Sequence, residues 1–189
     1  MHQSALYNAV KTPKLTFLLG VALCLLASCS QNTTTLKNVF SYNEATGIAT
    51  LDPAFAKNQS IMWAVHQVYN TLVEIDSNLN IVPSLAKSWE VSEDRKTYRF
   101  HLRTNVYFTN DDAFKEGVGR KLVAADVAYS LGRIIDKTVA SSGAWIFNGR
   151  VDSVMPFVVI NDSTFELRLQ RPFHPIMGIL STQYCSVVP

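Results

Sequence analysis

The segment SWEVSEDRKTYRFHLR, residues 88–103, alternates apolar and polar residues on both sides of a polar turn. After the turn, three apolar residues alternate with three basic ones: Tyr98, Phe100 and Leu102 against Arg99, His101 and Arg103. Successive side chains of a strand point to opposite faces. The segment therefore predicts an antiparallel hairpin with one core face, which includes Trp89, and one exposed basic face. His101 is expected to be an exposed strand residue.

The rest of the chain adds strands and helices in mixed order. A helix is expected to begin near Asn58 or Ser60, either of which can cap it, and its apolar stripe includes Ile61, Val65 and Val68. Other expected elements are a strand at 39–43, a short strand pair at 72–82, a helix at 123–136, a second hairpin at 157–169, a short helix at 176–180 and a strand near 187. The pattern predicts an α/β fold of mixed α+β character.

The start of the chain has the organisation of an export signal. Lys11 and Lys14 precede the apolar run LTFLLGVALCLLAS, residues 15–28. A run of this length is too short to span a membrane as a helix, which takes roughly 20 residues. A basic start, a short apolar middle and small residues at its end are typical of a secretory signal peptide. Residues 1–28 are therefore expected to be removed.

The tetrad Leu26-Ala27-Ser28-Cys29 resembles a bacterial lipobox. The resemblance implies that Cys29 is joined to a diacylglycerol and becomes the new N-terminus. Two or more acyl chains anchor a protein stably, whereas one holds only marginally. The alternative is an uncleaved N-terminal anchor with an incidental cysteine. The polar residues 29–38 then form a flexible tether, and 39–189 form the folded part.

Charge and chemistry-bearing residues exclude several classes of function. The chain has 17 basic and 15 acidic residues, and removing Lys11 and Lys14 leaves 15 of each. This balance gives no reason to expect a nucleic-acid partner. Cys24 lies in the signal, so Cys185 is left without a disulfide partner and is expected to be buried. Scattered histidines and the lack of a G-x-S-x-G motif argue against a metal site and an enzyme. No cofactor is expected.

Four motifs together resemble one family. They are TLDPAF at 50–55, PSLAKSW at 83–89, YRFHLR at 98–103 and ADVAYS at 125–130. In this order they resemble the extracytoplasmic solute-binding proteins that feed oligopeptide, dipeptide and nickel ABC importers. The resemblance implies a periplasmic-binding-protein-like fold of type II. It also implies that residues 39–189 are the N-terminal part of the solute-binding domain, with the second lobe absent.

Two departures from the family pattern lie close together in the sequence, in a loop and at the start of the helix that follows it. The family usually has a short F-x-D-G-x-P loop, whereas FTNDDAFKEGVGRKL, residues 108–122, is longer and lacks the proline. An insertion is therefore expected to remodel this edge. Gly117 and Gly119 lie in this charged loop, which is not the context of a dinucleotide site. Val123 stands where a capping Ser or Thr is usual, which costs the following helix about 1 kcal/mol. Asp126 is expected to have a structural role in the first turn of that helix.

The resemblance implies capture of a ligand, most commonly a short peptide, and its delivery to ABC permease subunits. It places the protein in the bacterial cell envelope, facing the periplasm or the exterior. Nickel, haem or another ligand remains open within the family, and a purely structural envelope lipoprotein remains open outside it.

The resemblance also places Tyr42, Asn43 and Glu44 near the ligand path, where backbone can add an extended peptide as a strand. Trp145 and Phe147 either form an aromatic wall or pack in the core.

Overall fold

A computed structural model describes residues 41–189 of the chain. The signal, Cys29, the tether and the first two residues of the expected strand at 39–43 lie outside the described residues. The chain divides into two units, residues 1–43 and residues 44–189, and the fold below is that of the second unit. None of the helices in the described range is long and apolar enough to cross a membrane.

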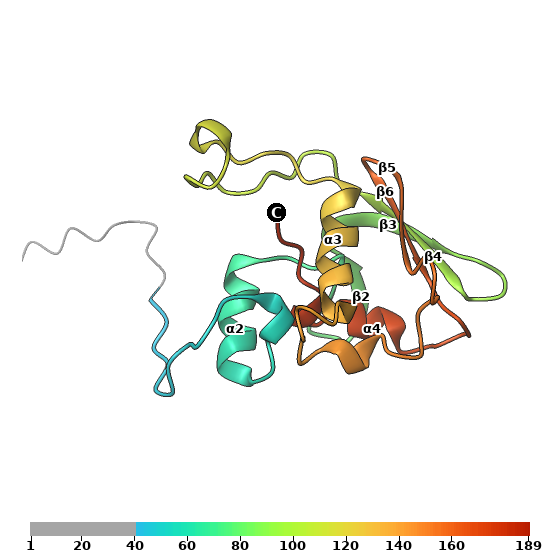
Figure 1. Cartoon of the computed structure of the whole chain (residues 1–189), viewed down its shortest axis with the longest axis horizontal. Helices are drawn as coiled ribbons and strands as arrows, with labels where there is room; N and C mark the ends of the chain where they lie inside the picture. Colours follow the sequence, from blue (N-terminus) through green and yellow to red (C-terminus); the bar gives the residue numbers. More distant parts are fainter. Residues whose placement is uncertain (1–40) are drawn as a thin grey trace, which may run out of the picture. The chain divides into compact units, whose positions relative to one another are not determined.

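A four-stranded antiparallel sheet organises the second unit (Figure 1). Its strands stand in the order β3-β4-β6-β5, with bounds Ala86–Val91, Thr97–Leu102, Thr164–Arg168 and Phe157–Asn161. Both predicted hairpins are present, as β3–β4 and β5–β6, and the pairing of β4 with β6 joins them. In this register Trp89, Phe100 and Phe165 lie opposite one another across three strands.

One face of the sheet carries the core. Phe100 and Phe165 are fully buried there, with ring centres 6.2 Å apart. Helix α3 (Ala124–Ile135) packs on β5 and β6, and its residues Val127, Leu131 and Ile134 are fully buried. The alternation seen in the sequence therefore gives the correct inner face for the central strands. The opposite face of the sheet, called the outer face below, carries the polar members of the alternation.

Smaller elements surround this core. Helix α2 (Gln59–Val68) begins after Asn58, whose Oδ1 accepts a hydrogen bond from the Ile61 amide at 3.1 Å, as predicted. The remaining elements are β1 (Val73–Ile75) paired with β2 (Ile81–Pro83), α4 (Ile176–Leu180), and the 3₁₀ turns η1 (Pro53–Phe55), η2 (Lys115–Gly117), η3 (Ala144–Ile146) and η4 (Gln183–Cys185).

Some expectations about burial and strands are wrong. Val68 is exposed, because α2 ends there and the chain leaves in an extended conformation. Trp89 is only half-buried, because β3 is an edge strand with one neighbour. Residues 41–43 and 186–189 are not strands, since no described strand pairs with them. The Val187 amide instead donates to the carbonyl of Asn70 at 2.9 Å.

Candidate functional site

The segment from Glu44 to Asn58, called the LDP segment here, is fixed to the body of the unit through Asp52. The Asp52 carboxylate accepts hydrogen bonds from the Ala54 amide at 3.0 Å and from the Arg133 guanidinium at 2.9 and 2.6 Å. Arg133 comes from α3, 81 residues along the chain. Its hydrogen bonds hold the pKa of Asp52 below the usual value. The sequence showed the LDP motif, but not that its aspartate has a partner on a distant helix.

Glu44 begins the LDP segment and is half-buried. Its Oε1 accepts hydrogen bonds from the amide and the hydroxyl of Thr46, at 3.1 and 2.7 Å. The Thr46 hydroxyl also lies 3.3 Å from that of Ser60 in α2. Glu44 is therefore tied to the start of α2. Tyr42 and Asn43 are exposed and belong to the first unit, so their position relative to Glu44 stays a prediction.

The two predicted aromatic residues are in different environments. Phe147 is fully buried and packs edge-on against Phe157, with ring centres 5.3 Å apart. Trp145 is 59% exposed. The pair therefore does not form an exposed aromatic wall in this structure. Phe147 follows the alternative of core packing, and the Trp145 side chain is exposed at the surface.

A cleft of about 650 Å³ opens between the end of α2, the loop at residues 107–121 and the chain near residue 187. This loop, called the projecting loop here, extends away from the sheet (Figure 1). The cleft walls carry the aromatic residues Tyr69, Tyr107, Phe108 and Phe114. None of the five predicted ligand residues lines this cleft. Sequence reasoning missed it, and the one available signal was the unusual length of the loop.

Arg120 provides a cationic group in the cleft, but its charge is compensated. Its guanidinium donates to both carboxylate oxygens of Asp126, at 2.8 and 2.6 Å, and lies 5.2 Å from the ring centre of Phe108. These hydrogen bonds raise the pKa of Arg120. Asp126 also accepts from the Val123 amide at 2.8 Å, which restores part of the helix capping that Val123 cannot supply. The cleft therefore suits an apolar or uncharged group better than a bare anion.

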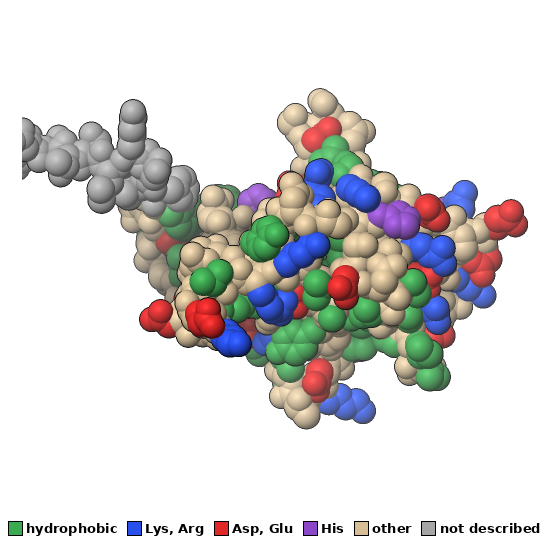
Figure 2. Space-filling view, turned by 90° about the horizontal axis from the view of Figure 1, so that it is seen from above, with side chains coloured by type: hydrophobic (Ala, Val, Ile, Leu, Met, Phe, Trp, Pro, Cys, Tyr) green, Lys and Arg blue, Asp and Glu red, His purple; other side chains and the backbone are tan. Residues whose placement is uncertain are grey.

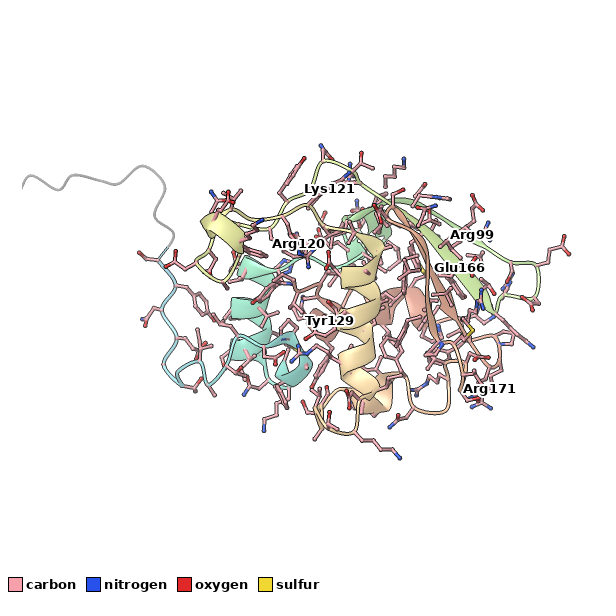
Figure 3. The ribbon with its side chains drawn as sticks, turned by 45° about the horizontal axis from the view of Figure 1, so that its top comes forward. Arg99, Arg120, Lys121, Tyr129, Glu166 and Arg171 are labelled. Atoms are coloured by element: carbon pink, nitrogen blue, oxygen red, sulfur yellow. The ribbon has the colours of Figure 1, made fainter. Side chains whose placement is uncertain are left out.

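The projecting loop has a closely packed base. The Phe108 amide donates to the Arg120 carbonyl, and the Leu122 amide to the Val106 carbonyl, each at 3.0 Å. Figure 3 shows Arg120 and Lys121 at this base. A Cβ on Gly119 would lie 1.9 Å from the carbonyl oxygen of Phe108. Gly119 is therefore needed because two backbone segments pack closely here. This packing accounts for the glycine without a bound nucleotide.

Other chemistry is sparse in the described residues. No group of three or more His, Cys, Asp or Glu among residues 41–189 could hold a metal ion. Cys185 is buried, and burial raises the pKa of its thiol to about 12. On the face shown in Figure 2, basic and acidic side chains are interspersed with small hydrophobic patches. Among the described residues discussed here, the side chains brought together form no acid–base or nucleophilic constellation.

Known proteins match both the sequence and the fold. The sequence pattern of the bacterial extracellular solute-binding proteins of family 5 matches residues 80–189. The probable ABC transporter periplasmic-binding protein SapA of Escherichia coli is 32% identical over 158 residues, 79% of this chain and 28% of that protein. The dipeptide-binding protein of Escherichia coli is 33% identical over 129 residues, 64% of this chain and 24% of that protein.

A solved structure extends the likeness to three dimensions. The periplasmic binding protein DppA of Helicobacter pylori, in complex with the peptide STSA, superposes with a TM-score of 0.66 at 27% identity. The match covers 75% of this chain and 29% of that protein. The mixed α/β fold is therefore that of a periplasmic binding protein of type II. The chain belongs to the family 5 bacterial extracellular solute-binding proteins, and it spans under a third of the length of these relatives.

Proposed function

We propose that the chain captures short peptides outside the cytoplasm for the permease subunits of an ABC importer, and that a lipid on Cys29 holds it at the membrane. The observation that carries the proposal is the family match over residues 80–189, and the similarity to a dipeptide-binding protein and to a periplasmic binding protein in complex with a peptide supports it. The lipobox-like tetrad ending at Cys29 supports the anchor. A tether near the permease raises the effective concentration of the captured ligand there.

The proposed ligand contacts are the start of the LDP segment and the exposed indole of Trp145. Glu44 is held by Thr46, which fixes its carboxylate at the start of the LDP segment, and Tyr42 and Asn43 precede it in the sequence. An extended peptide can pair with such backbone whatever its side chains, while a carboxylate can pair with its ammonium group. Phe147, buried in the core, follows directly after the 3₁₀ turn η3 that carries Trp145.

Calorimetry on the intact protein tests this proposal with a pool of di- to pentapeptides. Saturable binding is expected, and Glu44→Gln should weaken it about tenfold, which is ~1.4 kcal/mol. Glu93→Gln, which changes an exposed acid in the β3–β4 turn, is the matched control and should leave affinity unchanged. Absence of saturable binding by any peptide would favour a structural envelope lipoprotein. Unchanged affinity with a lower melting temperature would assign Glu44 to the fold.

A further inference from the structure

The outer face of the sheet contains a carboxylate that is buried although its face is turned away from the core. Glu166 of β6 stands opposite Arg99 of β4 and is only 3% exposed. It is covered by two arginines. Arg99 donates to Oε1 at 2.9 and 2.8 Å, and Arg168 donates to Oε2 at 3.2 and 2.8 Å. Figure 3 shows Arg99 and Glu166 beside each other on the sheet.

This arrangement leaves guanidinium groups oriented toward solvent. Both arginines use Nε and Nη2 for Glu166, and neither Nη1 makes a hydrogen bond to another described residue. Their side chains are 49% and 37% exposed. Burial alone would raise the pKa of Glu166, but the hydrogen bonds from Arg168 and Arg99 outweigh it and hold that pKa below the usual value. Glu166 therefore stays ionised and fixes the direction of both arginines.

The other residues of the outer face decide what it can bind. His101 in β4 and Arg103 just after its end continue the basic row, and Glu90 pairs with His101 at 3.1 Å. The described strands place no Trp, Tyr or Phe on this face, whose register pairs are Glu90–Arg99, Ser88–His101, Arg99–Glu166 and Val158–Glu166. Protein interfaces depend on buried aromatic or large apolar anchors, and among these register pairs the one apolar residue is the half-buried Val158. Guanidinium groups held in a plane instead match the oxygens of a phosphate group.

We infer that the outer face, around Arg99 and Arg168, rests on the anionic phospholipid headgroups of the membrane that carries the chain. The inference relies on the proposed lipid at Cys29. The chain between Cys29 and Glu44 can reach at most about 50 Å when fully extended. Within that distance a modest attraction between cations and anionic lipid is enough to select one orientation of the unit. Contact through the outer face would leave α3 and the cleft turned away from the lipid.

A fluorophore on the lipidated protein, reconstituted in vesicles that carry a quencher on their headgroups, tests the orientation. Ser88→Cys places the label on the outer face, and Tyr129→Cys places it on α3 as the matched control. The buried Cys185 thiol, with its pKa raised to about 12, does not compete for the label. In vesicles containing phosphatidylglycerol we expect about twofold more quenching at position 88 than at 129, lost at high salt or in pure phosphatidylcholine.

A charge variant that leaves Glu166 intact gives a second measurement. Among the described residues the side chain of Arg103 donates to the carbonyl of Ser84, and its backbone amide donates to that of Leu85, which the substitution keeps. Arg103→Gln should therefore fold and reduce the quenching at position 88. Lys137→Gln, the same charge change on an exposed residue beyond α3, should leave the quenching unchanged.

The other outcomes are distinct. Equal quenching at both positions on protein that sediments with vesicles would overturn the orientation alone. Failure to sediment with either vesicle type would overturn the anchor and the orientation together. Shielding of position 88 only in native membranes, and not in pure lipid, would show a protein partner and would also overturn the inference.

Discussion

At the scale of single residues, ion pairs between distant segments hold this unit together. Asp52 and Arg133 form one such pair, and both side chains are less than a third exposed. Hydrogen bonds to charged groups stabilise a fold more than neutral ones, because a partner left alone in a partly buried site loses its solvation. The aspartate of the LDP motif therefore contributes to stability.

Replacing Asp52 by Asn keeps an acceptor for the Ala54 amide but removes the charge that faces Arg133. We expect the unfolding free energy to fall by about 1.5–3 kcal/mol, as for a hydrogen bond to a charged group. Thermal or urea unfolding followed by circular dichroism measures this. Asp136→Asn, at an exposed aspartate that pairs with no cation among the described residues, is the control. Equal stability of the two variants would show that the Asp52–Arg133 pair contributes nothing.

The environment of Glu166 predicts how the stability of the fold depends on pH. Its folded-state pKa lies below that of an unfolded glutamate, about 4.3. Its contribution to stability is therefore fully present above that value and is lost as the pH falls through the folded-state pKa. Unfolding free energies measured from neutral pH down to pH ~3 should decline in this window. The decline should be shallower in Glu166→Gln, and an identical pH dependence of the two proteins would contradict the assignment.

At the scale of elements, the periodicity of the sequence was sufficient for most of the fold. Both hairpins, α2, α3 and α4 follow from signals that span a few residues, such as alternation and an Asn58 cap. The half-burial of Trp89 was not predictable, because alternation does not tell an edge strand from a central one. The cleft was not predictable either, because its walls come from three segments far apart in sequence. The Asp52–Arg133 pair was not predictable for the same reason, because 81 residues separate its two members.

The projecting loop supplies a test at this scale. Gly119→Ala would place a methyl group against the Phe108 carbonyl, where the added Cβ has only 1.9 Å. The base of the loop must then move, and the Phe108–Arg120 hydrogen bond should be lost. We expect amide exchange to rise about tenfold or more in residues 106–122 while β4 and β6 stay protected.

Gly178→Ala, at a helical glycine with open space around it, is the control for this variant. Unchanged exchange in the projecting loop of Gly119→Ala would show that the base of the loop tolerates the displacement.

At the scale of the whole molecule, anchoring is the first property to test. Cys29→Ser removes the only thiol that the lipobox-like tetrad offers for a lipid. We expect the variant to lose the acyl chains and with them its lipid-dependent attachment, because stable anchoring needs two or more chains. Metabolic labelling with a fatty acid and membrane fractionation measure the two effects. Incorporation of label into Cys29→Ser would contradict the assignment of Cys29.

The order of strands in the sheet has a consequence for how the molecule is made. The outer pairings, β3 with β4 and β5 with β6, are hairpins, but the central pairing joins Arg99 to Glu166, 67 residues later. A nascent chain appears N-terminus first, at about 5–20 residues per second, so β4 waits roughly three to thirteen seconds for β6. Throughout that interval an apolar edge stands open to other nascent copies. The yield of native protein should therefore depend on translation speed between these two strands more than on speed anywhere inside the hairpins.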